Sequence, residues 1–89
     1  MITKTVVISN KLGLHARAAA KLVTTASQFK SGLRLHKDDK VVDGKSIMSV
    51  MLLAAGIGTE LVIEADGPDE DAALEAVCAL IDDKFGEGE

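Results

Sequence analysis

The order of hydrophobic patterns along the chain is the feature that most constrains its fold. Short β-branched or alternating runs predict four strands, over residues 3–9, 33–36, 41–42 and 61–66. Apolar residues at helical spacing predict three helices, over residues 14–28, 47–53 and 69–85. Turn residues separate these runs, and no repeat or linker interrupts them. The chain therefore reads as strand, helix, strand, strand, helix, strand, helix.

This order predicts an α+β domain with two layers. Four short strands cannot cover both of their own faces, so three helices are expected on one face of a four-stranded antiparallel sheet, an open-faced sandwich. Thr3, Thr5 and Arg34 alternate with apolar neighbours, which predicts that the other face is solvated. A chain of 89 residues has room for one core, so residues 1–89 are expected to form a single domain.

Local signals predict where the helices begin and end. Ser46 is placed to cap the second helix, which Gly56 and Gly58 would close. The acidic residues 69–71 suit the positive end of the last helix. Gly86 would stop that helix, and the tail over residues 86–89 is expected to fray.

Composition excludes several classes of function. Trp and Tyr are absent, only Phe29 and Phe85 are aromatic, and the formal charge is −4, so nucleic-acid binding is a poor interpretation. Cys78 is the single cysteine, which predicts a packed, reduced thiol and a cytoplasmic protein. The longest apolar stretch, over residues 47–57, falls short of the roughly 18 residues that a membrane span needs. The first residues lack the basic-then-apolar layout of an export signal, so export is not expected.

Charge is unevenly distributed. Residues 1–45 carry nine Lys or Arg against three Asp, or +6, whereas residues 46–89 carry one Lys against eleven acids, or −10. This polarity predicts that the basic half meets an acidic partner or a phosphorylated group. The alternative is a solvated surface whose charge asymmetry is incidental. If charge is the only evidence considered, this alternative is favoured.

The chain lacks the common sequence motifs of metal and nucleotide sites. The chain has no HExxH, no Cys-His cluster and no Walker lysine motif, so no metal and no cofactor are expected. Its paired acids lie in turns or at helix ends, where solvated charge is the simpler explanation. His36 lies in a predicted strand, where we expect no acid or nucleophile close to the ring, and this favours a structural or solvent-facing role.

One segment, Gly13-Leu14-His15-Ala16-Arg17, places a histidine where a glycine-containing loop enters a helix. The first turn of a helix has unpaired N–H donors and a partial positive charge, so it binds phosphate, and Arg17 adds a planar cationic fork. The same field disfavours a charged imidazole and leaves a nitrogen lone pair of His15 for attack. We expect an accessible ring that no carboxylate closes off. The alternative is a surface histidine that only caps the helix.

The segment Asn10-Lys11-Leu12-Gly13-Leu14-His15-Ala16-Arg17 resembles the active-site signature of HPr-type phosphocarrier proteins of the bacterial phosphotransferase system. Gly44-Lys45-Ser46-Ile47-Met48 and Leu52-Leu53-Ala54-Ala55-Gly56 resemble a second signature, and the likeness spans the whole chain. The resemblance implies that enzyme I, which draws on phosphoenolpyruvate, phosphorylates His15 on Nδ1. An enzyme IIA protein would then receive the group. Arg17 and the N–H groups of Ala16 and Arg17 would steady the phosphate.

Two positions depart from the sugar-transporting members of that family. Those members usually have proline after the arginine and asparagine before the glycine, whereas this chain has Ala18 and Leu12. Alanine is tolerated in the first turn of a helix. Leu12 cannot donate a hydrogen bond to the imidazole as asparagine could. With the Asn-Lys-Leu-Gly lead-in, these departures favour the nitrogen-related or regulatory branch, NPr.

The resemblance also indicates a docking patch beside His15. On the first helix, the side chains opposite the core face of Ala19, Leu22, Val23 and Ala26 are all small: Ala16, Ala20, Thr24 and Ser27. They form a flat surface that a protein could approach, or a plain solvent-facing side. The second helix is too short to bury all of its apolar residues, so exposed docking residues are expected among Ile47, Met48, Met51 and Leu52. Val50 and Leu53 are expected to pack in the core.

Ser46 has a second predicted role besides capping. In family members served by a dedicated serine kinase or phosphorylase this position is phosphorylated, and a phosphate there would put negative charge into the docking patch.

Taken together, the His15 segment and the resemblance lead us to expect a monomeric phosphoryl-transfer component and not a free-standing enzyme. Two rivals remain at this point: a regulatory binding module without phosphotransfer, and a small-ligand sensor, which would need a lined cavity.

Overall fold

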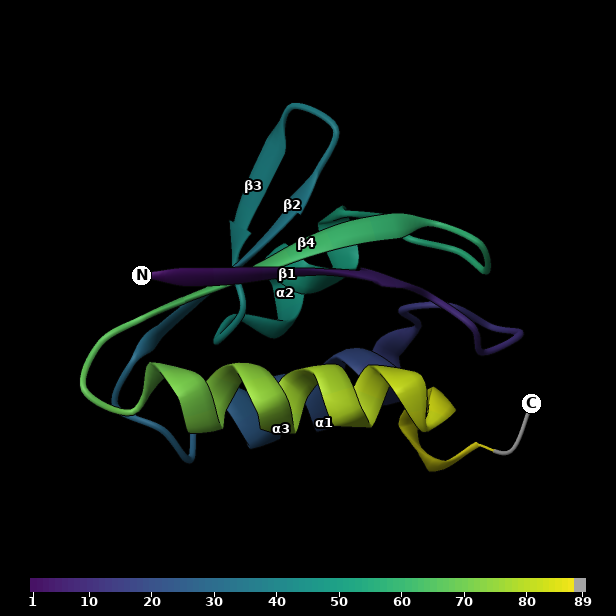
Figure 1. Ribbon diagram of the computed structural model, residues 1–89. Helices are drawn as coiled ribbons and strands as arrows, with labels where there is room; N and C mark the ends of the chain where they lie inside the picture. The colour runs from purple at the N-terminus through teal and green to yellow at the C-terminus, as the bar shows by residue number, and fades with distance from the viewer. Residues whose placement is uncertain (88–89) are drawn as a thin grey trace.

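Strands and helices follow one another in the predicted order in the computed structural model, which describes residues 1–87 (Figure 1). The strands are β1 (Ile2–Val7), β2 (Gly32–Lys37), β3 (Lys40–Asp43) and β4 (Glu60–Asp66). The helices are α1 (Ala16–Ala26), α2 (Ile47–Leu52) and α3 (Glu70–Asp82), followed by a short 3₁₀ turn, η1 (Lys84–Gly86). No helix within these residues is long and apolar enough to cross a membrane.

The strands form one antiparallel sheet in the order β1-β4-β2-β3. β4 therefore lies inside the sheet, between β1 and β2, and it pairs Val62 with Thr5 on one side and Ile63 with Leu35 on the other. Leu61, Ile63 and Ala65 are buried on its inner face, as expected for a strand with both neighbours present. The sheet brings segments far apart in the chain into register.

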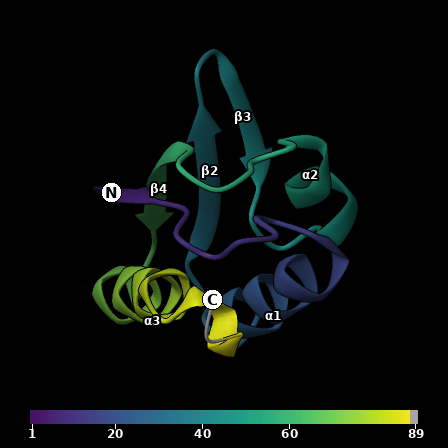
Figure 2. The same ribbon diagram turned by 90° about the vertical axis from the view of Figure 1, so that its right-hand side faces the viewer.

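The helices and one face of the sheet share a single core. α1 and α3 run side by side beneath the sheet, while α2 packs against α1 and β3 (Figures 1 and 2). The core is aliphatic apart from Phe85 and Cys78, and its largest fully buried members include Leu22, Leu35, Leu53 and Ile63. Thr3, Thr5 and Arg34 are exposed on the opposite face. The predicted α+β open-faced sandwich is thus confirmed.

One predicted detail of the helices was incomplete and another was wrong. α1 buries Ala19, Leu22 and Ala26 as predicted and also Ala18, while Val23 packs against the core and is only partly buried. α2 ends before Gly56, because Ala54 adopts a left-handed conformation with φ of 52° and turns the chain out of the helix. This early turn directs the Ala55 carbonyl toward the loop before α1, where it accepts a hydrogen bond from the Leu14 N–H at 2.8 Å.

Asp69 does more than favour the positive end of α3. Its side chain makes no capping bond to the helix; instead its carboxylate accepts hydrogen bonds from the backbone N–H groups of Ser31, at 2.8 Å, and Lys30, at 3.0 Å. The Ser31 hydroxyl donates as well. These bonds lower the pKa of Asp69 from 3.8 to about 2, and the bond from the Ser31 hydroxyl contributes most to the shift. Asp69 therefore joins the start of α3 to the start of β2.

This link predicts an acid-sensitive fold. Because the pKa of Asp69 is lower in the folded chain, its carboxylate contributes stability above the ordinary value of 3.8, and the contribution is lost as the pH falls toward about 2. Urea unfolding followed by circular dichroism between pH 5 and pH 2 should show a smaller pH dependence for Asp69→Asn than for the unmodified chain. Asp71→Asn, an exposed acid in the same helical turn, is the control. Equal pH dependence of all three proteins would contradict this role.

Candidate active site

The loop before α1 is shaped by a close approach to the segment after α2. Gly13 has φ of +67°, and a Cβ atom there would lie 2.5 Å from the Ala55 carbonyl oxygen and 2.7 Å from the Gly56 Cα. Only glycine fits this position. The loop can therefore pack against the end of α2, and its next residues deliver His15 as the N-cap of α1, in an extended conformation.

The N-terminus of α1 is open to an anion. His15 makes no side-chain capping bond, and no residue of the described chain accepts a hydrogen bond from the backbone N–H groups of Ala16 and Arg17. Ala16 and the Arg17 side chain are exposed. Unpaired donors, the helix dipole and a guanidinium therefore meet at one point on the surface. This arrangement is the one that the sequence predicts.

The ring of His15 has a partner that the sequence does not predict. Its Nε2 contacts Oε2 of Glu87, 72 residues away along the chain. Asn10 Nδ2 donates both to the Gly13 carbonyl, at 2.8 Å, and to Oε1 of Glu87, at 2.9 Å. The expectation of a frayed tail is thus wrong for Gly86 and Glu87, whereas residues 88 and 89 lie outside the described residues. No periodic pattern in the sequence signals a contact of this range.

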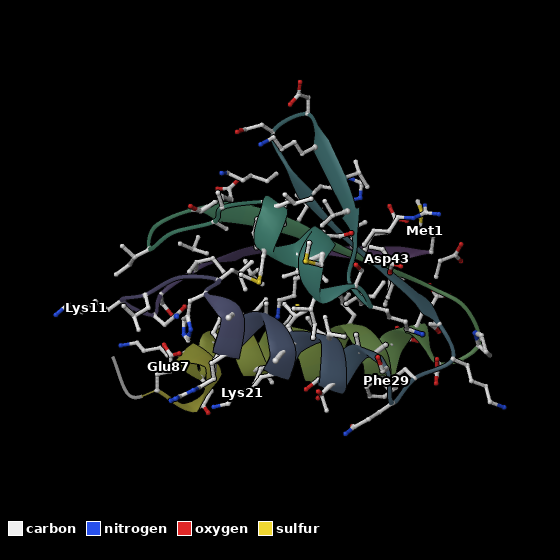
Figure 3. All side chains as sticks on the ribbon, turned by 180° about the vertical axis from the view of Figure 1, so that it is seen from behind. Met1, Lys11, Lys21, Phe29, Asp43 and Glu87 are labelled. Atoms are coloured by element: carbon white, nitrogen blue, oxygen red, sulfur yellow. The ribbon has the colours of Figure 1, made fainter. Side chains whose placement is uncertain are left out.

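The carboxylate does not close the ring off. The side chain of His15 is 27% exposed and lines an open groove of about 820 Å³ with Lys11, Leu12, Arg17 and Lys21. Figure 3 shows Lys11, Lys21 and Glu87 at one end of the molecule, away from Met1 and Asp43. Three cationic side chains therefore surround the histidine and its carboxylate, and a negatively charged donor group would approach along them.

The contact with Glu87 decides which ring nitrogen is free. Hydrogen bonds from Asn10 first, and from His15 next, lower the pKa of the Glu87 carboxyl. An ionised carboxylate only accepts hydrogen bonds, so the hydrogen at this contact is on Nε2 of His15. In the neutral ring the lone pair is then on Nδ1, which has no hydrogen-bond partner among residues 1–87. The site presents an available nitrogen nucleophile.

Around this site the structure places the predicted docking residues at the surface. Met48 and Leu52 are 74% and 70% exposed, Ile47 and Met51 are exposed as well, and Val50 and Leu53 are fully buried. On α1, Thr24 is exposed and Ala20 is half-buried. Among the other exposed apolar residues, Leu12 and Ile57 lie in turns and were not predicted to be exposed. Each is flanked by turn residues in the sequence and belongs to no hydrophobic periodicity, so no sequence pattern predicts its exposure.

The predicted role of Ser46 as a cap is confirmed. Its Oγ accepts a hydrogen bond from the backbone N–H of Ser49 at 3.3 Å, at the first turn of α2. Ser46 is half-exposed beside Ile47 and Met48. A negative charge on its hydroxyl would therefore lie at the edge of the apolar surface of α2.

His36 has an acidic neighbour after all. Its Nε2 lies 3.0 Å from Oε1 of Glu64, whose other oxygen accepts a hydrogen bond from Arg34 at 3.2 Å. The sequence separates these residues by 28 positions, and only the pairing of β2 with β4 brings them together. The ring belongs to an ion-pair cluster on the open face of the sheet. Within residues 1–87, no three His, Cys, Asp or Glu side chains gather as a metal site would require.

Comparison with known proteins identifies the family. The family model described as the phosphorylation site of the HPr component of the phosphotransferase system (PTS) matches residues 2–83. The chain belongs to the HPr family of phosphocarrier proteins. Phosphocarrier protein HPr of Cupriavidus necator is 53% identical over 89 residues, covering all of both chains, and HPr of Neisseria meningitidis serogroup A is equally similar over the same span.

Solved HPr structures agree with this fold. The crystal structure of an HPr from Thermoanaerobacter tengcongensis matches with a TM-score of 0.94 at 47% identity and covers 98% of each chain. A dimeric form of HPr from the same organism matches with a TM-score of 0.79 and covers 98% of this chain and 100% of its own. The family membership makes this protein an HPr phosphocarrier of the phosphotransferase system.

Proposed function

We propose that His15 accepts a phosphoryl group from phosphorylated enzyme I and passes it to an enzyme IIA protein. The observation that carries this proposal is the position of the His15 ring, partly exposed at the start of α1, where the N–H groups of Ala16 and Arg17 have no acceptor among residues 1–87. The chain acts in the cytoplasm as one monomeric domain and needs no cofactor. It is a component of a transferase system and does no metabolic chemistry of its own.

The transfer needs two bond changes. The Nδ1 lone pair of His15 forms the bond to phosphorus as the bond to the donor breaks, and the donor keeps that electron pair. The phosphoryl oxygens then face the first turn of α1, where the N–H groups of Ala16 and Arg17 and the Arg17 guanidinium stabilise their charge. On delivery, a nucleophile of the acceptor protein forms the new bond to phosphorus as the nitrogen–phosphorus bond breaks, and the electron pair of the broken bond returns to Nδ1. Positioning and charge neutralisation supply most of the catalysis.

The docking surface supports exchange between two successive partners. Ile47, Met48, Met51 and Leu52 on α2 are exposed apolar residues, and Ala20 and Thr24 on the adjoining α1 are small. Flexible methionine side chains adapt to more than one partner. A regulatory binding module could use the same surface without phosphotransfer, and the nitrogen-related branch that Leu12 and Ala18 favour would add such a role.

Phosphorylation of the purified chain tests the carrier proposal. Incubation with enzyme I and labelled phosphoenolpyruvate should give one phosphate per chain that is labile in acid and stable in base, because it is bound to histidine nitrogen. His15→Ala should take up no label, and His36→Ala, on the open face of the sheet, should label like the unmodified chain. An unlabelled chain that still binds partners through α2 would instead support the regulatory module.

Substitution at Ser46 tests regulation. We expect Ser46→Asp to slow phosphorylation of His15 by enzyme I by about tenfold, since a like charge placed at an interface with an acidic partner is strongly unfavourable. Ser46→Ala removes the cap without adding charge and should react at nearly the unmodified rate. Equal rates for all three proteins would remove the regulatory role of Ser46 and leave the carrier function intact.

A further inference from the structure

The end of the chain adopts a costly backbone conformation beside the active site. Lys84, Phe85 and Gly86 are three consecutive residues with positive φ, at 56°, 55° and 74°. Residues with a side chain rarely adopt this conformation, and it persists only where the surrounding structure enforces it. The turn reverses the chain after α3 and carries Glu87 back to the loop before α1.

Packing and hydrogen bonds hold this turn in place. The Phe85 side chain is fully buried in the core, and its carbonyl accepts a hydrogen bond from Lys21 Nζ of α1 at 2.6 Å. The N–H groups of Gly86 and Glu87 bond to the carbonyls of Asp83 and Lys84, both at 3.0 Å. The turn, yellow in Figure 2, lies against α1. The burial of Phe85 and the hydrogen bonds of the turn therefore fix the position of Glu87.

A buried amide then orients the carboxylate. Asn10 is fully buried, and its Nδ2 donates to the Gly13 carbonyl and to Oε1 of Glu87. Both partners are pure acceptors, so the amide nitrogen must face them. Oε1 of Glu87 is fixed by Asn10, and Oε2 is directed at Nε2 of His15.

We propose that Glu87 is a positioning residue for phosphotransfer, which holds the hydrogen of His15 on Nε2 and thereby presents Nδ1 to phosphorus. This inference rests on the proposed function. As the Nδ1 lone pair forms the new bond, the ring gains positive charge that spreads to Nε2–H, and the Glu87 carboxylate stabilises it. The proton stays on Nε2 throughout. The neighbouring cations Lys11, Arg17 and Lys21 line the same groove and would otherwise oppose that charge.

The substitution Glu87→Gln reverses this arrangement. Because Asn10 Nδ2 is a donor, the carbonyl oxygen of the introduced glutamine should pair with it and turn the amide NH₂ group toward Nε2 of His15. A donor at Nε2 requires a lone pair there, so the hydrogen moves to Nδ1 and the nucleophile is lost. We expect the protonated nitrogen to change from Nε2 to Nδ1 in long-range ¹H–¹⁵N spectra. Phosphorylation by enzyme I should slow by about tenfold or more, as for other partners that orient a histidine.

Glu75→Gln is the matched control, because Glu75 is an exposed acid of α3 outside the groove. It should leave the His15 tautomer and the phosphorylation rate unchanged. An unchanged tautomer in Glu87→Gln, or a rate equal to or faster than that of the unmodified chain, overturns the inference; a faster rate would mean that Glu87 obstructs the donor. Failure of the unmodified chain to take up label contradicts the proposed function itself, which is a distinct result.

Discussion

The hydrogen bond from the Leu14 N–H to the Ala55 carbonyl joins two loops that are 41 positions apart, and the site depends on it. It requires Gly13, since any side chain there would clash with Ala55 and Gly56. It also requires the left-handed Ala54, which turns the chain out of α2 so that Ala55 faces the loop. With both in place, the loop leads directly into α1, and His15 is the N-cap of a helix whose first N–H groups have no acceptor among residues 1–87.

A second constraint comes from the opposite end of the chain. Burial of Phe85 stabilises a left-handed turn that the backbone alone would not favour, and the turn brings Glu87 to Nε2 of His15. Asn10 connects both constraints, because its side-chain amide donates to Gly13 in the loop and to Glu87 in the turn. The imidazole is thus held at Nε2 by a carboxylate, while His15 itself is the N-cap residue of α1. In the proposed transfer, the Glu87 carboxylate stabilises positive charge on the ring, and the N-terminus of α1 stabilises negative charge on the phosphate.

Sequence patterns predict the elements and the start of α1 because these depend on local periodicity and on residues close together in the chain. The loop Gly13-Leu14-His15 and the cap at Ser46 belong to this class. Glu87 does not, because its contact with His15 depends on a turn set by the burial of Phe85. The same holds for the pairing of His36 with Glu64, which follows from strand register, and for Asp69, whose bonds to Lys30 and Ser31 follow from the packing of α3 beside β2. Local patterns carry no information on such contacts, in which side chains from distant segments meet.

The identity of the phosphorylated atom tests the account most directly. NMR of the ¹⁵N-labelled chain after reaction with enzyme I and phosphoenolpyruvate reports, through nitrogen–phosphorus coupling, which ring nitrogen is bonded to phosphorus. We predict phosphorus on Nδ1 of His15, with Nε2 still carrying its hydrogen. Phosphorus on Nε2 of His15, or on either nitrogen of His36, would contradict it.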